Sequence, residues 1–217
     1  MSATAADNPP VPARRIYARI SLFGVSLLLA AFLSPYPDSP GSGKTAFLSM
    51  YSTLTGPPSI VIWKTGYSLT LYRGATPIKT YASVFGRGYA DGDKAQEGDR
   101  RTPEGEFYIC SMNHSKRFYK FMGLSYPGLK HAQAGLQNGL ISLPEYYSIA
   151  RAIQERRQPS WDTRLGGAIG IHGRLLLDTE QAPSLENWTD GCIALSNADV
   201  DELFSILSVG TPVTIIP

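Results

Sequence analysis

The sequence predicts a mainly β domain that carries a helical insert in its middle and one short helix near its C-terminus. Three observations lead to this fold class. From residue 58 onward, short runs of alternating apolar and polar residues are separated by turn residues such as Gly66 and Gly74. Apolar residues take helical spacing between 128 and 158, and do so again after Cys192. With 217 residues, 43% of them hydrophobic, the chain suffices for one ordinary domain plus an appendage.

The expected strands lie on both sides of the helical insert. The run "SIVIWKTGYSLTLYRGATPIKTYASVFG" indicates three strands separated by turns at 64–66 and 73–74. A polar loop with a Thr-Pro and a Glu-Gly turn leads to "GEFYICSMN", an alternating strand in which Cys110 is expected to be a small buried residue. Two later runs, "GGAIGIHG" and "TPVTIIP", are expected to complete the β structure.

Capping patterns mark the helices. Ser142 and Glu145 are three residues apart and form a capping-box pattern before an apolar run with helical spacing. Ser196 is expected to cap a helix of about ten residues that ends near Gly210. No internal repeat and no second domain are indicated.

The N-terminal part has the pattern of an export signal. Three arginines, Arg14, Arg15 and Arg19, precede an uncharged apolar run, residues 20–33. If the span starts at Ile16, with Arg19 reaching toward the interface, it is about long enough for a short membrane anchor. We therefore expect residues 16–33 to be a signal anchor or a signal peptide, and favour the anchor because no small-x-small cleavage site follows. Residues 1–15 would then be cytoplasmic and the domain periplasmic, anchored in the inner membrane or secreted.

Residues 34–57 are rich in Pro, Ser, Gly and Thr and are expected to be a flexible linker to a domain at 58–217. This segment contains "GSGKT", part of a phosphate-loop pattern, but Asp38 occupies the position of that motif's first glycine and no strand precedes it. The formal net charge is only +2, and lysines and arginines are scattered along the chain. These features argue against nucleic acid as a partner.

Cys192 is the strongest candidate for chemistry. It follows Gly191 at the end of a polar turn, and His172 ends an apolar run 20 residues earlier, directly before Gly173. A cysteine nucleophile needs a base or a cation to form its thiolate, and histidine is the usual choice. The glycine permits a tight turn with converging N–H groups, and the helix that starts near Ser196 adds a favourable dipole. From the residues alone, a nucleophile and a buried structural thiol remain equally open.

The remaining histidines and the second cysteine leave a further alternative. His114 and His131 lie in polar contexts and are expected at the surface. An exported protein with two cysteines is also a candidate for one disulfide. A bridge between Cys110 and Cys192 therefore stays open, and it would exclude thiol chemistry.

Several motifs resemble the L,D-transpeptidase catalytic domain of bacterial cell-wall enzymes. "IGIHG", followed after 15 residues by "TDGCIALSN", resembles the family signature, a His-Gly pair before a Ser/Thr-His-Gly-Cys segment. "GDRRTPEGEFYI", residues 98–109, resembles a second hallmark, Gly-Asp…Thr-Pro-x-Gly-x-Phe. "VIWKTGYSLTLYRGATPIKTYASVFG" resembles the family's opening strands. The resemblance covers residues 58–217 and implies a β-sandwich or barrel-like domain.

This resemblance implies a peptidoglycan L,D-transpeptidase acting on stem peptides. Cys192 would attack the carbonyl of the third stem residue, a meso-diaminopimelate, release the terminal D-alanine and hold the stem as a thioester. An amine of a neighbouring stem would then form the cross-link, with His172 as the base. The N–H groups around Gly191 and Cys192 would bind the oxyanion, in a turn region that includes Asp190 and Gly173. No metal and no organic cofactor is implied.

Two other functions remain open. With water as the acceptor, the same Cys192–His172 pair would make the protein an L,D-carboxypeptidase, a hydrolase of peptidoglycan stems. A non-catalytic wall-binding module is the other alternative, if Asp190 has spoiled the site. The presence of both a base and a thiol argues against that module.

The sequence departs from the family pattern at two positions. Asp190 stands where histidine is usual, and Ala194 stands where arginine or asparagine is common. An ionised Asp190 would disfavour the thiolate by like-charge repulsion. It could also hold the turn through backbone N–H groups, orient His172, or only shape the loop.

The possible substrate contacts are Thr189, Arg174 and Tyr126. Arg174 could pair with a substrate carboxylate, although a solvated surface arginine is the commoner outcome. The helical insert, residues 128–158, is expected to be a packed structural excursion. The alternative is a lid over the donor groove.

Overall fold

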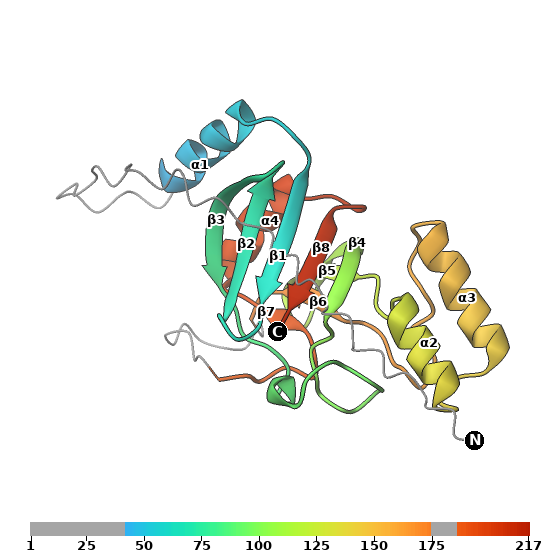
Figure 1. Cartoon of the computed structure of the whole chain (residues 1–217). Helices are drawn as coiled ribbons and strands as arrows, with labels where there is room; N and C mark the ends of the chain where they lie inside the picture. Colours follow the sequence, from blue (N-terminus) through green and yellow to red (C-terminus); the bar gives the residue numbers. More distant parts are fainter. Residues whose placement is uncertain (1–41, 175–185) are drawn as a thin grey trace, which may run out of the picture. The chain divides into compact units, whose positions relative to one another are not determined.

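The computed structural model describes residues 42–174 and 186–217, and in this part of the chain an eight-stranded sheet forms the framework. The strands follow the order β3-β2-β1-β8-β4-β5-β6-β7 (Figure 1). Their bounds are Pro58–Trp63 (β1), Ser68–Arg73 (β2), Thr76–Ala82 (β3), Gly105–Ser115 (β4), Tyr119–Leu124 (β5), Gly170–His172 (β6), Ile193–Ala194 (β7) and Pro212–Ile216 (β8). The helices are α1 (Ser42–Thr53), α2 (Leu129–Gln137), α3 (Leu143–Gln154) and α4 (Asn197–Ile206), with a 3-10 turn at Tyr89–Asp91.

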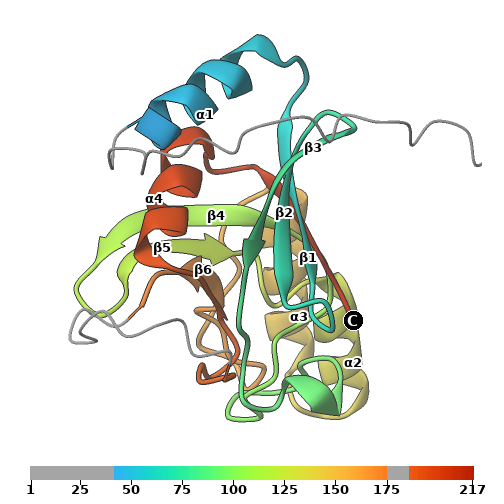
Figure 2. The same cartoon turned by 90° about the vertical axis from the view of Figure 1, so that its left-hand side faces the viewer.

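The mainly β prediction is confirmed, and the sheet is curled into a half-barrel. β1, β2 and β3 form the expected antiparallel hairpins, while β8 pairs parallel with β1 and antiparallel with β4. The C-terminal strand therefore lies in the middle of the sheet. Figure 2 shows β4 and β5 running across the direction of β1–β3. The core is formed by alternate strand residues such as Ile60, Ile62, Leu69, Leu71, Val213 and Ile215.

Two isolated bridges link the chain after β3 to the far edge of the sheet. Val84 pairs with Ala194 in β7, and Gly86 pairs with Thr189. Both edges of the curled sheet are thus joined through residues 84–86, far from β7 in the sequence. This closure determines where the segment around Cys192 lies.

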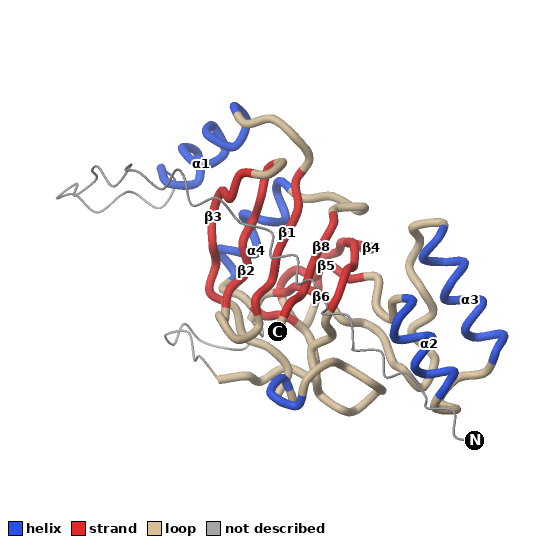
Figure 3. The backbone as a smooth tube through the Cα atoms, viewed as in Figure 1, coloured by secondary structure: helices blue, strands red, loops and turns tan. Residues whose placement is uncertain are grey.

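The helical insert is confirmed as the pair α2 and α3, drawn in blue on the side of β4 in Figure 3. The capping box of α3 is present: the Ser142 side chain accepts from the Glu145 N–H at 3.4 Å, and the Glu145 carboxylate accepts from the Ser142 N–H at 2.6 Å. The two helices pack on a small apolar cluster of their own, made of Ala132, Ile141, Ile149 and Leu165. The short C-terminal helix is α4, capped by Ser196 as predicted.

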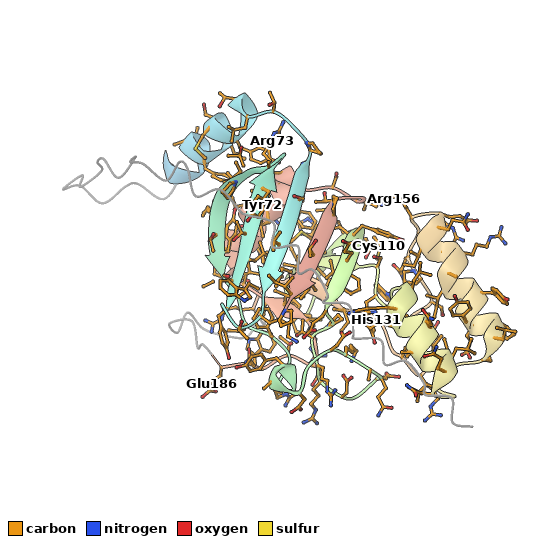
Figure 4. The ribbon with its side chains drawn as sticks, in the orientation of Figure 1. Tyr72, Arg73, Cys110, His131, Arg156 and Glu186 are labelled. Carbon is orange, nitrogen blue, oxygen red and sulfur yellow. The ribbon has the colours of Figure 1, made fainter. Side chains whose placement is uncertain are left out.

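The expected flexible linker at 34–57 lies outside the described residues as far as residue 41, and the expectation is wrong for residues 42–53, which form α1. Tyr51 is buried, and the Arg73 guanidinium lies 4.5 Å from the centre of its ring. Arg73 Nε also donates to the carbonyl of Leu54 at 2.9 Å, and Figure 4 shows Arg73 beside α1. Phe47 and Tyr51 lie one helical turn apart and give α1 an apolar face. This face is not evident from the overall composition of the segment, which is rich in Pro, Ser, Gly and Thr.

The expected signal anchor at 16–33 and the cytoplasmic segment at 1–15 lie outside the described residues. Among the helices that the structure describes, none is both long enough and apolar enough to cross a membrane.

Two further expectations change. His131 is buried and not at the surface: its Nε2 lies 3.1 Å from Asp93 Oδ1, and its ring packs between Phe107 and Tyr126. Figure 4 shows it at α2, which the sequence pattern alone could not place against the sheet. The alternative of a disulfide is excluded, because Cys110 on β4 and Cys192 are both free thiols. Cys110 is half-buried.

Candidate active site

Adjacent parallel strands bring the two candidate residues to one side of the sheet. In β6 and β7, Ile171 pairs with Ile193 and His172 pairs with Ala194, and the Leu195 N–H donates to the His172 carbonyl at 3.0 Å. Ile171 and Ile193 are both fully buried in the core. Because side chains alternate along a strand, His172 projects to the other face. Cys192, directly before β7, alternates with Ile193 and shares the His172 face.

The turn before Cys192 depends on a glycine and a threonine. Gly191 has a φ of +131°, and a Cβ atom there would lie 2.7 Å from the Arg101 carbonyl oxygen. The Thr189 hydroxyl donates to the Cys192 carbonyl at 2.7 Å and accepts from the Gly191 N–H at 3.2 Å. Thr189 thus holds the turn with its side chain. The prediction that Gly191 shapes a tight turn agrees with this geometry. The Gly191 N–H, however, already donates to Thr189, so of the two N–H groups expected to bind an oxyanion only that of Cys192 remains.

The turn is also held from outside by the chain after β3. The Arg87 N–H donates to the Thr189 carbonyl at 3.0 Å, and the Thr189 N–H donates to the Phe85 carbonyl at 3.2 Å. The Asn187 side-chain oxygen accepts from the Phe85 N–H at 2.7 Å. The segment that precedes Cys192 therefore has backbone partners from a distant part of the chain, which positions the thiol.

The loop "GDRRTPEGEFYI" contributes two positioning residues that sequence reasoning did not assign. The Asp99 carboxylate accepts from Lys94 Nζ at 2.7 Å and from the N–H groups of Ala95, Gln96 and Arg101 at 2.7 to 3.1 Å. The buried Thr102 hydroxyl accepts from the Gly86 N–H at 2.9 Å. The Gly-Asp and Thr-Pro of the motif were the available signal. Asp99 shapes the loop itself, and Thr102 joins the loop to Gly86, which pairs with Thr189 before Cys192.

His172 is buried, and its ring has one free lone pair for chemistry. Its Nδ1 lies 2.6 Å from the Gly173 carbonyl oxygen. Because a carbonyl only accepts, Nδ1 carries the hydrogen, and in the neutral ring Nε2 is the basic nitrogen. The ring stacks on Phe118 at 4.2 Å between centroids and meets Trp188 edge-on at 5.6 Å. Burial lowers the pKa of His172 to about 4, the charge of Arg117 adds to this, and the bond to Gly173 opposes it.

The surroundings of Cys192 favour the protonated form of its thiol. Although the residue is partly exposed, burial raises the pKa of its thiol to about 11. The Asp190 carboxylate raises that pKa further, whereas a backbone hydrogen bond and the charges of Lys94 and Arg117 lower it. The sulfur lies 3.5 Å from the Ala168 carbonyl oxygen, to which the S–H donates. A neutral thiol and a neutral imidazole on the same face favour proton transfer during attack over a preformed ion pair.

Asp190 faces outward and pairs with two arginines. Its Oδ1 lies 2.6 Å from Arg87 Nη2 and 3.8 Å from Arg100 Nε, and its side chain is 68% exposed. The expected roles, in which Asp190 accepts N–H bonds of the turn or orients His172, do not match these contacts. Thr189 holds the turn in its place, and Gly173 holds His172 Nδ1.

The expected substrate contacts lie in different surroundings. Tyr126 is fully buried and donates to the Leu165 carbonyl at 3.0 Å, so a direct substrate contact was the wrong expectation. Thr189 is buried in the turn described above. Arg174 is partly exposed, and its N–H donates to the Asn197 side chain at 2.8 Å. A Cβ on Gly173 would lie 2.3 Å from the same Asn197 oxygen, so a glycine is needed between His172 and Arg174.

A pocket of about 400 Å³ is lined by residues next to Ala168 and by Asp190, two residues before Cys192. Ala168, whose carbonyl accepts from Cys192, lies between two of its lining residues. The pocket is lined by Lys94, Glu97, Gly98, Arg100, Gly166, Gly167, Ile169 and Asp190. None of these residues belongs to α2 or α3, so the helical insert does not line this pocket. The apolar cluster under α2 and α3 agrees with the expectation that the insert is a packed structural excursion.

Solved structures with a similar arrangement include two proteins of known source. The chain is 19% identical to the helical cell shape determining protein Pgp2 from Campylobacter jejuni, with a TM-score of 0.49, covering 79% of this chain and 54% of that one. It is 17% identical to Bd1075 of Bdellovibrio bacteriovorus, with a TM-score of 0.48, covering 75% and 48%. The chain thus spans about half of the length of each. A comparison with curated proteins gives no match.

A third similar structure is L,D-transpeptidase 1 of Mycobacterium tuberculosis, at 14% identity and a TM-score of 0.41, covering 74% of this chain and 62% of that one. These values are too low to carry a conclusion on activity. The decisive finding is a match over residues 57–215 to the family model described as the L,D-transpeptidase catalytic domain, YkuD. The match takes in both hallmark motifs together with His172 and Cys192. The chain belongs to the L,D-transpeptidase catalytic domain family.

Proposed function

We propose that the protein is a peptidoglycan L,D-transpeptidase in which Cys192 is the nucleophile and His172 the general base. The observation that carries this proposal is the parallel pairing of β6 with β7, which directs both side chains to one face. The bond from His172 Nδ1 to Gly173 leaves Nε2 as the nitrogen that can accept a proton. Family membership supplies the substrate class, the stem peptides of peptidoglycan.

In the first half-reaction, the Cys192 sulfur attacks the carbonyl of the third stem residue while its proton passes to His172 Nε2. The peptide C–N bond then breaks, and the departing D-alanine amine takes that proton from His172. The product is a thioester on Cys192. The Cys192 N–H is the candidate donor to the oxyanion, because the Gly191 N–H donates to Thr189.

In the second half-reaction, an amine of a neighbouring stem attacks the thioester and gives its proton to His172. The C–S bond breaks, the Cys192 sulfur takes that proton back from His172, and an amide joins the two stems. Water in place of the amine would give the L,D-carboxypeptidase outcome with the same residues. The burial of His172 among Phe118 and Trp188 supports the transferase, because a dry site disfavours water as the acceptor.

The location follows from the substrate and the N-terminal sequence. A domain that cross-links cell-wall stems works outside the cytoplasm. We propose that residues 16–33 either anchor it in the inner membrane or direct its secretion, with the domain in the periplasm.

The proposal is tested by incubating full-length protein with purified tetrapeptide muropeptides under reducing conditions and analysing the products by mass spectrometry. Wild type and Cys110→Ala, which removes only the other thiol, are expected to give cross-linked dimer and free D-alanine. Cys192→Ala is expected to give neither. Tripeptide without dimer would instead establish the carboxypeptidase, and no product from wild type would leave the non-catalytic wall-binding module as the better reading.

A further inference from the structure

Three chain segments meet beside Cys192 at distances that only glycines permit. A Cβ on Gly86 would lie 2.2 Å from the Arg100 carbonyl oxygen and 2.9 Å from the Cα of Gly191. A Cβ on Gly88 would lie 2.7 Å from the Asp99 carbonyl oxygen, and the Gly88 N–H donates to the Arg100 carbonyl at 2.9 Å. This close backbone packing therefore fixes the positions of residues 87 and 100 relative to the turn before Cys192.

Both side chains that leave this junction are arginines, and both approach one carboxylate. Arg87 Nη2 lies 2.6 Å from Asp190 Oδ1, and Arg100 Nε lies 3.8 Å from the same atom. Two positive charges thus face one negative charge. A guanidinium has five N–H donors, and the bond to Asp190 uses one donor of Arg87. Among the described residues, the Arg100 side chain makes no hydrogen bond, so both arginines keep donors for a second carboxylate.

The arginine cluster borders the pocket described above. Arg100 and Asp190 line that pocket together with Lys94 and Glu97. Lys94 is buried and neutralised by Asp99 at 2.7 Å. Glu97 is the remaining acidic side chain of the lining, and its Cβ lies against Gly166. Arg87 and Arg100 are thus matched in number by Asp190 and Glu97, and what they offer an anion is the set of N–H donors that Asp190 does not use.

We propose that Arg87 and Arg100, preoriented by Asp190, bind the carboxylate that ends the donor stem, one residue beyond the carbonyl that Cys192 attacks. This inference rests on the proposed function and adds its specificity determinant. One residue spans about 3.3–3.6 Å, so the terminal carboxylate of a bound tetrapeptide stays close to the thiol. Guanidinium groups match a carboxylate with two parallel hydrogen bonds.

The arrangement also gives Asp190 a role that neither the turn nor His172 provides. Without a counter-charge, two neighbouring guanidinium groups would repel each other and spread into solvent. Asp190 holds Arg87 by a hydrogen bond and Arg100 by its charge, next to the Gly191–Cys192 step. A stem that ends in a free carboxylate one residue after the attacked carbonyl would be preferred to a stem that is longer or blocked at that end.

The test measures binding in the Cys192→Ala background, so that turnover does not intervene. Two ligands are compared by calorimetry: the tetrapeptide stem with its terminal carboxylate free, and the same peptide with a terminal carboxamide. We expect the free acid to bind about tenfold or more tightly, as for a hydrogen-bonded charge. Adding Arg87→Gln and Arg100→Gln should reduce this ratio to about one, and the paired lysine variants should give an intermediate ratio.

The matched control is Arg151→Gln, an arginine of α3 that is 76% exposed and paired with Glu155. It should leave the ratio of the two affinities unchanged, and melting curves of all variants should report the same fold. Equal binding of acid and amide before the arginines are changed overturns the inference, as does an absence of binding or an unchanged ratio in the glutamine variants. Turnover by wild type, measured separately, decides the proposed function.

Discussion

The imidazole of His172 stacks on the ring of Phe118, with 4.2 Å between the two centroids, at the tip of the β4–β5 hairpin. The Gly173 N–H also donates to the Phe118 carbonyl at 3.2 Å. This hairpin therefore covers the proposed base and keeps it out of water. The low pKa of His172 follows mainly from that burial.

Phe118→Ala should hydrate His172 and raise its pKa from about 4 toward its ordinary value of 6.5. Since the base must be neutral to accept the thiol proton, activity should begin to fall at a higher pH than in wild type. An NMR titration of the His172 ring and the acid limb of the pH–rate profile measure the shift. Phe204→Ala, which removes a ring packed on His114 and not on His172, is the control and should leave that limb in place.

The same shift makes stability depend on pH. The unfolded chain takes up a proton at His172 near pH 6.5, whereas the folded protein does so only near pH 4. Proton uptake between these values favours unfolding, so stability is lost as pH falls through this window and the loss is complete below it. At 1.36 kcal/mol for each pKa unit, the loss is about 3 kcal/mol.

Denaturant unfolding of wild type and His172→Gln between pH 4 and pH 7.5 tests this linkage. The difference in unfolding free energy between the two proteins should change by about 3 kcal/mol across the window, because other groups contribute equally to both. Parallel curves would show that the imidazole titrates at its ordinary pKa in the folded protein.

The reactivity of Cys192 should follow its raised pKa. In the Cys110→Ala background, alkylation by iodoacetamide should increase about tenfold for each pH unit up to about pH 11. At pH 8 only about 0.1% of the thiol would be ionised. Fast labelling that is independent of pH between 6 and 8 would instead reveal a thiolate–imidazolium pair. The background is needed because burial also raises the pKa of Cys110 to about 11.

Gly191→Ala should remove activity and destabilise the fold, because its φ is +131° and the new Cβ would meet the Arg101 carbonyl oxygen at 2.7 Å. Gly139→Ala is the matched control, with a φ of +67° and open space around the new atom. The control should cost about 1 kcal/mol of stability from backbone strain alone and retain turnover. The melting temperature and the turnover of both variants are measured side by side. Equal values for Gly191→Ala and Gly139→Ala would contradict this explanation.

Thr189→Val should lower both stability and activity, because it leaves the Cys192 carbonyl and the Gly191 N–H without their shared partner. The cost is expected to be about 1–3 kcal/mol. Thr189→Ser keeps the hydroxyl and should retain most of both properties. Chemical denaturation together with muropeptide turnover measures the pair, and a serine variant as damaged as the valine variant would point to lost packing instead.

The sequence by itself determined much of the local structure. Alternation and turn residues located β1 to β4, and the spacing of Ser142 and Glu145 located the start of α3, because these signals act within a few residues. The position of Cys192 after a glycine, and of His172 at the end of an apolar run, likewise identified the candidate pair. The apolar side of α1 was missed, since Tyr51 becomes buried only through Arg73 and the folded core.

Only the tertiary structure decided which distant segments share the site. Periodicity tells which face of a strand is buried, but not which strand lies beside it or how far a sheet curls. The pairing of Arg87 with Asp190, 103 residues apart, exists because the closing bridges bring the chain after β3 to β7. Tyr126 and His131 looked accessible in sequence and are buried for the same reason: their partners, Leu165 and Asp93, lie 39 and 38 residues away. Burial and charge pairing between residues so far apart in the sequence depend on how the sheet closes. The periodicity of residues within one strand or helix cannot predict them.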